Sequence, residues 1–322
     1  MSAPATSLPL QELVFVQEAV SAAAALRAAN ALGVLACLDE EPRDAATLAR
    51  ECAISERGTR ALLGALAGVG LVEAMDGGAF RASADLAVLG SLLTPWDHLT
   101  DAIQHGEPAE RGDTPDGAQA LYPAVVPRLA SWFAEAAECA AGVLARPGLR
   151  IVDVGAGAAP WSRAIAARDA TCRVTTVDVP AVLQMTRRAV EAAGLREQFA
   201  YLDGDASTLH LPAAAYDLAI IANFCHLFGE PENRALLGRL LAALRPGGQL
   251  AIVDAVPNER FDSPRTVMLY ALGLLLRTSR GQVYPFSTYL DWLHDAGYER
   301  VERVDLGGSL PITLITAQRP GC

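Results

Sequence analysis

Two acidic residues and two glycines in the middle of the chain have the spacing of a nucleoside-binding site. An apolar run leads into Asp153, Gly155 and Gly157, and a second apolar run ends on Asp178. Glycines after a buried strand let the backbone turn sharply and approach a ligand closely. A carboxylate at the end of the next strand is placed to accept hydrogen bonds from ribose hydroxyls. These residues therefore predict a pocket that recognises a nucleoside.

The same region does not fit the common phosphate-binding motifs. The dinucleotide fingerprint G-x-G-x-x-G requires a glycine at position 160, which is Pro in this chain. Pro160 instead suits the first turn of a helix, where its missing N–H is no loss. A G-x-x-x-x-G-K-[ST] loop is excluded because the chain contains no lysine. A nucleoside without phosphates is therefore the better candidate ligand.

Strands and helices alternate around these residues, which predicts a parallel sheet. The segment 216–223 is almost continuously apolar, as expected for a strand with both sheet faces covered. A helix is predicted from Glu232 to Leu244, and the run Arg245-Pro246-Gly247-Gly248 is typical of a helix end. The fifth strand is then predicted from Gln249 to Val256.

Four motifs in this order resemble the class I S-adenosylmethionine-dependent methyltransferases. They are the D-x-G-x-G segment from Asp153, the acidic strand end at Asp178, Gly204-Asp205 after the third strand, and R-P-G-G before the fifth. The resemblance covers roughly residues 145–319 and implies a Rossmann-like α/β fold with a mostly parallel sheet of seven strands. The third glycine of the family's loop is Ala159 here.

The resemblance implies that the cofactor is S-adenosyl-L-methionine and that S-adenosyl-L-homocysteine is its product. Asp153, Gly155 and Gly157 are then expected to face the methionine moiety. The remaining predicted contacts are Asp178 with Val179 at the ribose, Asp205 with Ala206 at the adenine edge, and Asn223 near the sulfonium.

A histidine follows the fourth strand, at the sheet edge where ligands bind in open α/β folds. The resemblance places the general base at this position, His226, with Asp254 at the end of strand five as its acidic partner. A phenol, with a pKa of about 10, is mostly protonated at neutral pH, and a histidine can accept its proton during attack. The family's H-D-W segment reads His226-Leu227-Phe228, and its second acidic partner falls near Gln282. The alternative is that His226 binds the substrate without abstracting a proton.

The first ninety residues form a separate predicted unit. Asp44 and Ser55 are placed to cap two helices, 45–52 and 56–69, and a turn at 76–78 predicts a hairpin. Helix, turn, helix and hairpin in this order look like a winged helix, which raises the possibility of DNA binding. The net charge of −11 and the scarcity of basic residues on the second helix argue against nucleic acid as a partner.

A winged-helix dimerisation domain ahead of a class I methyltransferase domain is similar to the small-molecule O-methyltransferases, which include caffeate-type and bacterial tailoring enzymes. The resemblance predicts three parts: a dimerisation domain at 1–92, connecting helices that line the substrate pocket at 93–145, and the catalytic domain at 146–322. It also implies a homodimer, in which helices from about Leu10 to Leu38 interlock two subunits.

The expected acceptor is a small, largely apolar molecule, aromatic or polyketide-like, that carries a hydroxyl. Its predicted contacts are Trp132, Phe133, Phe224, Met268 and Leu272. Apolar residues at helical spacing more often form core than pocket, so this set is an interpretation of position. The same fold also supports non-methylating reactions, such as hydroxylation, decarboxylation or pericyclic chemistry, and this alternative stays open. A transcriptional regulator with a degenerate methyltransferase domain is disfavoured by the acidic charge and by Asp178.

The remaining sequence features predict a cytoplasmic enzyme. The N-terminus has no basic residue ahead of an apolar core, and the most apolar stretch, 20–38, is interrupted by Arg27 and Asn30. These features predict neither a secretory signal nor a membrane span. Six cysteines without metal-ligand spacing are expected to be free thiols in a reducing compartment, and no metal site is predicted.

Overall fold

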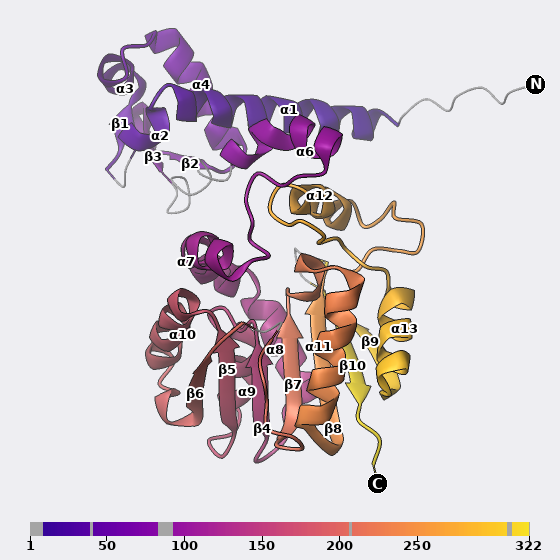
Figure 1. Ribbon diagram of the computed structural model, residues 1–322. Coiled ribbons are helices and arrows are strands. Elements are labelled where there is room, and N and C mark those ends of the chain that lie inside the picture. The colour runs from indigo at the N-terminus through magenta and orange to yellow at the C-terminus, as the bar shows by residue number, and fades with distance from the viewer. Residues whose placement is uncertain (1–8, 39–40, 83–92, 206–207, 308–310, 322) are drawn as a thin grey trace, which may run out of the picture. The chain divides into compact units, whose positions relative to one another are not determined.

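The computed structural model describes residues 9–38, 41–82, 93–205, 208–307 and 311–321 (Figure 1). The chain divides into two compact units, Met1–Asp97 and His98–Cys322. Each unit buries its own apolar side chains, as expected for two domains.

The N-terminal unit consists of helices and a small antiparallel sheet with the strand order β1-β3-β2. Its elements are α1 (Leu10–Ala31), α2 (Val34–Cys37), β1 (Arg43–Asp44), α3 (Ala45–Glu51), α4 (Glu56–Gly68), β2 (Val72–Ala74), η1 (Asp76–Gly78) and β3 (Ala79–Ala82). Both predicted helix caps are confirmed: Asp44 accepts from the Thr47 N–H at 2.7 Å, and Ser55 accepts from the Gly58 N–H at 3.1 Å. Gly33, with φ +74°, separates α1 from α2.

The C-terminal unit is built around a seven-stranded sheet in the order β6-β5-β4-β7-β8-β10-β9. Neighbours from β6 to β8 pair in parallel, and β10 is antiparallel to both β8 and β9. The strands are β4 (Arg150–Val154), β5 (Arg173–Asp178), β6 (Phe199–Asp203), β7 (Tyr216–Ala222), β8 (Leu244–Asp254), β9 (Glu299–Asp305) and β10 (Thr313–Gln318). The predicted mostly parallel sheet of seven strands is confirmed.

The helices of this unit are α6 (Leu99–His105), α7 (Pro115–Trp132), α8 (Ala134–Leu144), α9 (Pro160–Ala166), α10 (Pro180–Ala192), α11 (Glu230–Ala243), α12 (Arg265–Leu274) and α13 (Phe286–Ala296). Helices α8 and α9 pack on one face of the sheet, and α11 and α13 pack on the other. Short 3₁₀ turns lie at η2 (Thr94–His98), η3 (Arg196–Gln198) and η4 (Cys225–Leu227). The helices α7 and α12 lie beyond the carboxyl ends of the parallel strands (Figure 1).

The central strand β7 shows why its sequence is apolar throughout. Leu218 and Ile220 belong to the core cluster that contains α8 and α9, whereas Ala219 and Ile221 belong to the cluster that contains α11 and α13. Successive side chains of a strand point to opposite faces, so a strand covered on both faces must be apolar at every position.

The run Arg245–Gly248 was predicted as a helix end ahead of a strand that starts at Gln249, but it belongs to the strand. Helix α11 ends at Ala243, and the strand β8 already begins at Leu244, which pairs with Tyr216 of β7. The pairing is irregular between Leu244 and Gln249, where Gly247 has φ +76°. An ion pair between Arg245 and Asp217, with N and O 2.7 Å apart, holds this segment against β7.

Candidate active site

The glycine-rich turn after β4 has the left-handed backbone that its sequence predicts. Gly155 has φ +67° and Gly157 has φ +56°. The Gly155 N–H donates to the Val177 carbonyl at 2.9 Å, which ties the turn to the neighbouring strand. Ala159, in place of the family's third glycine, is fully buried and also left-handed, with φ +55°. The alanine therefore adopts a backbone conformation that favours glycine at the start of α9, and this strain raises the energy of the loop.

Asp178, at the end of β5, faces the same turn. Its carboxylate accepts from the Gly157 N–H at 2.9 Å and from the Val179 N–H at 2.8 Å, one donor on each oxygen. An ionised carboxylate has about four acceptor positions, so both oxygens can still accept from a ligand. Burial raises the pKa of Asp178 to about 6, and the two backbone N–H groups oppose this shift. The side chain is therefore prepared to accept hydrogen bonds from a diol.

Asp153 lies beneath the turn, in the protein interior. It is 1% exposed, and its Oδ2 accepts from the Ser162 hydroxyl at 2.5 Å. Its Oδ1 is buried without a hydrogen-bond partner. Burial raises the pKa of Asp153 to about 7, partly offset by the bond from Ser162. Asp153 does not belong to the wall of the cavity beside the turn, so any influence on a ligand passes through the loop.

A cavity with about 1000 Å³ of empty space, part of it open to solvent, lies above the turn. Its wall contains most of the predicted cofactor residues, namely Gly155, Gly157, Asp178, Val179, Asp205 and Asn223. Ala206, the other predicted adenine contact, falls outside the described residues.

The predicted substrate residues are divided by the fold. Phe133 and Phe224 line the cavity, and the Phe224 ring packs against Gly155 so closely that a Cβ there would lie 2.3 Å from it. Trp132 is 52% exposed and lies outside the cavity wall. Met268 and Leu272, on α12, are half-buried and also lie outside this wall.

Helix α7 supplies wall residues that the sequence reasoning did not single out. Tyr122, Val126 and Leu129 line the cavity together with Phe133. Their spacing of four, three and four residues marks one face of a helix, so helical periodicity could have identified them. Tyr122 also carries a buried hydroxyl with no hydrogen-bond partner in the structure.

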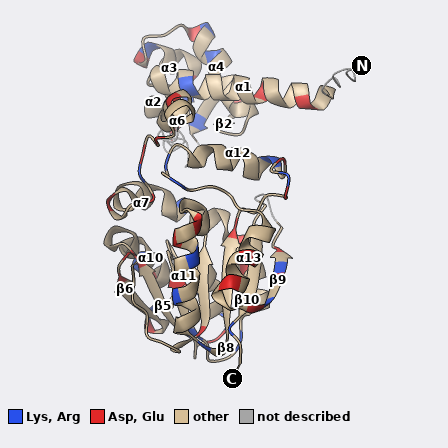
Figure 2. Cartoon of the chain, turned by 45° about the vertical axis from the view of Figure 1, so that its right-hand side comes forward, with Lys and Arg blue, Asp and Glu red and all other residues tan. Residues whose placement is uncertain are grey.

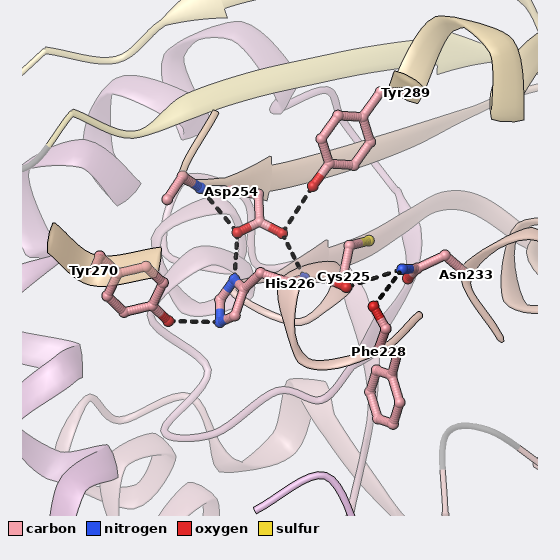
Figure 3. Close-up of polar contacts among 8 residues, drawn as sticks. Cys225, His226, Phe228, Asn233, Asp254, Tyr270 and Tyr289 are labelled. Atoms are coloured by element: carbon pink, nitrogen blue, oxygen red, sulfur yellow. Dashed lines mark hydrogen bonds and ion pairs between the residues drawn. The ribbon is translucent and has the colours of Figure 1, made fainter. Parts of the chain in front are cut away.

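The predicted base and its acidic partner are in direct contact. His226, in η4, has its Nδ1 2.5 Å from Oδ1 of Asp254, at the end of β8 (Figure 3). Their side chains are 3% and 0% exposed. A carboxylate only accepts hydrogen bonds, so Nδ1 carries the proton and the lone pair of the imidazole lies on Nε2. This arrangement can orient a histidine to accept a proton at Nε2.

Asp254 is held by three further donors. The backbone N–H groups of Ala255 and His226 donate to it at 2.8 and 3.2 Å, and the Tyr289 hydroxyl donates to Oδ2 at 3.1 Å. Four donors occupy the acceptor positions of an ionised carboxylate. The sequence reasoning missed Tyr289, which lies 35 residues beyond its partner.

The turn that carries His226 is fixed by a buried asparagine. Asn233, which is 1% exposed, donates from Nδ2 to the carbonyls of Cys225 and Phe228 at 2.9 and 3.3 Å (Figure 3). These carbonyls flank His226 in the chain, so the asparagine on α11 locks the position of the imidazole.

Comparison with known proteins identifies the domain that carries this site. Residues 144–299 match the family model of the O-methyltransferase domain. Acetylserotonin O-methyltransferase of Mus musculus molossinus is 29% identical over 297 residues, which cover 81% of this chain and 76% of the mouse protein. Residues 144–299 therefore form an O-methyltransferase domain.

Other members agree with this assignment. The 3-hydroxy-5-methyl-1-naphthoate 3-O-methyltransferase of Streptomyces sahachiroi is 26% identical over 306 residues, which cover 87% of this O-methyltransferase and 86% of the relative. Human N-acetylserotonin methyltransferase, solved in complex with S-adenosylmethionine, shares the fold, with a TM-score of 0.73, 22% identity and 100% coverage of both chains.

The chain is thus an S-adenosylmethionine-dependent O-methyltransferase, as the sequence motifs predicted. Its cofactor is S-adenosyl-L-methionine, and S-adenosyl-L-homocysteine is the product. The relatives favour methyl transfer over the non-methylating alternative. Among the described residues, no helix is long and apolar enough to cross a membrane.

Proposed function

We propose that this O-methyltransferase methylates a hydroxyl of a largely apolar aromatic acceptor, with His226 as the general base. The observation that carries the assignment is the buried pair of His226 and Asp254, which follows β7 and β8 at the cavity end of the sheet. The apolar wall from α7, together with Phe224, suits an aromatic ring. Two relatives bear the names of aromatic acceptors, acetylserotonin and a hydroxynaphthoate.

The described residues fit the cofactor. The left-handed turn brings the backbone of Gly155 and Gly157 to the cavity, and Asp178 keeps an acceptor position on each oxygen for the two ribose hydroxyls. Val179, Asp205 and Asn223 complete the proposed set around it. When bound, S-adenosyl-L-methionine supplies a methyl group on a positively charged sulfur.

The task of the protein is then to position the acceptor and remove its proton. A hydroxyl becomes a better nucleophile as it loses its proton, and general bases typically contribute 10²- to 10⁴-fold to the rate. Nε2 of His226 carries the lone pair that takes this proton, and Asp254 stabilises the imidazolium that forms. The apolar wall excludes water from the reacting atoms.

The assignment is tested with the purified chain, S-adenosyl-L-methionine and two acceptors, N-acetylserotonin and 3-hydroxy-5-methyl-1-naphthoate. We expect a methyl ether and an equimolar amount of S-adenosyl-L-homocysteine by mass spectrometry. His226→Ala should lose at least about 100-fold in turnover and keep its calorimetric affinity for S-adenosyl-L-homocysteine. A variant with near wild-type turnover contradicts the role of His226, and a methyl group on carbon contradicts the O-methyl assignment.

We further propose a homodimer formed through α1 of a winged-helix dimerisation domain. Figure 2 shows tan residues along most of α1, with few charged positions. Leu10, Leu13, Val16 and Val20 are 50–76% exposed, although helices of monomeric proteins usually hide such side chains. The prediction is that Val16→Glu combined with Val20→Glu yields a monomer in sedimentation experiments. Ala65→Glu, on the exposed face of α4, is the matched control and should leave the dimer intact.

A further inference from the structure

A tyrosine hydroxyl covers the imidazole lone pair of His226, the proposed base. The hydroxyl of Tyr270, on α12, lies 2.6 Å from Nε2 of His226 (Figure 3). The two rings meet edge to face, with centroids 5.1 Å apart. Because Nε2 has no proton, the tyrosine O–H is the donor. Neither His226 nor Tyr270 belongs to the cavity wall, but in this arrangement a proton can reach Nε2 only through the Tyr270 hydroxyl that occupies it.

Tyr270 is fixed in this position by its surroundings. It packs in an apolar cluster with Val267, Leu274 and Ala255. The guanidinium of Arg277 lies over its ring, 4.8 Å from the centroid. Removing the phenol from Nε2 would disrupt buried contacts and a cation–π interaction.

The same cluster forms part of the cavity wall. Tyr122, Phe224, Leu227 and Phe228 belong both to the cluster that holds Tyr270 and to the lining of the cavity. Tyr270 therefore packs with side chains that line the cavity, although it is not itself part of the wall. Its oxygen donates one hydrogen bond, to His226, and can accept two, so it can receive a hydrogen bond from an acceptor hydroxyl.

We propose that Tyr270 is a catalytic residue that relays the proton from the acceptor hydroxyl to His226. This inference rests on the proposed function, because it requires His226 to be the final proton acceptor. It adds a residue in direct contact with the acceptor hydroxyl.

The relay moves two protons and leaves Tyr270 unchanged. The acceptor oxygen forms a bond to the methyl carbon as the carbon–sulfur bond breaks and its electron pair stays on sulfur. The acceptor's proton passes to the Tyr270 oxygen, and the original Tyr270 proton passes to Nε2. Burial raises the pKa of Tyr270 to about 12, so the phenol is neutral and able to donate at physiological pH. The Arg277 cation opposes this shift and so favours negative charge that develops on the phenol oxygen.

The test compares Tyr270→Phe with Tyr298→Phe, which also removes a buried tyrosine hydroxyl, but one that donates to the Leu237 carbonyl and contacts neither His226 nor Asp254. The probes are naphthols of graded acidity, from 2-naphthol to a nitro-substituted naphthol that is ionised before it binds. Single-turnover rates of methyl transfer are measured at saturating S-adenosyl-L-methionine. We expect Tyr270→Phe to lose about 100-fold or more with 2-naphthol and a few-fold at most with the ionised naphthol. Tyr298→Phe should show no such dependence on acidity.

Each outcome decides the proposal. An unchanged rate in Tyr270→Phe, or a lower KM with a higher rate, would mean that the phenol merely covers the base. An equal loss with every naphthol would assign Tyr270 a structural role. An active His226→Ala overturns the base and the relay together, whereas an inactive His226→Ala beside a fully active Tyr270→Phe overturns the relay alone. If Tyr270→Phe fails to fold, wild-type rates in mixtures of H₂O and D₂O decide: two transferred protons give a curved dependence, and one gives a straight line.

Discussion

The affinity for the product cofactor should depend on pH through Asp178. Burial raises the pKa of Asp178 in the free protein to about 6, and ribose hydroxyls bind mainly to its ionised form, which is the stronger acceptor and accepts on both oxygens. At pH 5 the ionised fraction is about one-eleventh, and at pH 7.5 it is nearly complete. The affinity should therefore rise about tenfold between these pH values, which is about 1.4 kcal/mol. S-adenosyl-L-homocysteine is the suitable ligand because it has no sulfonium charge.

The measurement is isothermal titration calorimetry from pH 5 to 8. Asp178→Asn should bind more weakly, with an affinity that no longer changes near pH 6. Asp153→Asn is the matched control, since that side chain lies under the loop and outside the cavity wall, and the rise near pH 6 should persist in it. An affinity that is constant between pH 5 and 7.5, or that falls with rising pH, would refute the reasoning.

Thermal stability of the free protein should respond to pH in the opposite direction. The pKa values of Asp178 and Asp153 are raised to about 6 and about 7, above the ordinary 3.8 of the unfolded chain. Between pH 4 and 7 the folded state therefore binds more protons than the unfolded state, so these groups make the free energy of unfolding fall as pH rises. Their contribution should lower the Tm of the ligand-free wild type between pH 5 and 7.5, and Asp153→Asn should reduce this slope.

Three further perturbations test the architecture of the site. Asp254→Asn removes the carboxylate that fixes the tautomer of His226, so turnover should fall about 10²- to 10⁴-fold. The calorimetric affinity for S-adenosyl-L-homocysteine should be retained, and equal losses of turnover and affinity would contradict this role. Gly155→Ala places a Cβ 2.3 Å from the Phe224 ring, so the affinity for S-adenosyl-L-homocysteine should fall. The control is Gly194→Ala, which is also at positive φ but has nothing within 4 Å of the added Cβ. It should lose about 1 kcal/mol in free energy of unfolding and keep the affinity. Asn233→Ala leaves the carbonyls of Cys225 and Phe228 without the side-chain donor that bonds to them. Urea unfolding should then report a loss of about 1–3 kcal/mol in the free energy of unfolding, and turnover should also fall. An unchanged unfolding midpoint would contradict this account.

The fold and the cofactor turn were predictable because they depend on local sequence. The alternation of apolar runs with capped helices specifies the strands, and the positive φ of Gly155 and Gly157 is a property of the glycines themselves. Asp178 was equally predictable, because its place at the end of a strand fixes the sheet edge on which it lies.

The contacts of the proposed base depended on tertiary packing. His226 and Asp254 were paired by resemblance to a family, but Tyr270 and Tyr289 come from helices 44 and 35 residues away from their partners. Local sequence gives a helix its apolar stripe but not the neighbour that this stripe will meet.

Adjacent residues on one helix show the same limit. Trp132 and Phe133 are both aromatic and were both expected at the acceptor, yet Trp132 is 52% exposed whereas Phe133 is 7% exposed and lines the cavity. Successive residues at a helix end point about 100° apart, so only the packing of α7 against α8 and α10 decides which of the two is enclosed. The sequence by itself determined the class of enzyme, through its motifs, and the glycine turn proposed to hold the nucleoside, because such a turn depends on the backbone preferences of a short segment. The tertiary structure alone decided which side chains surround the proton acceptor, because their contacts join segments that are distant in the chain.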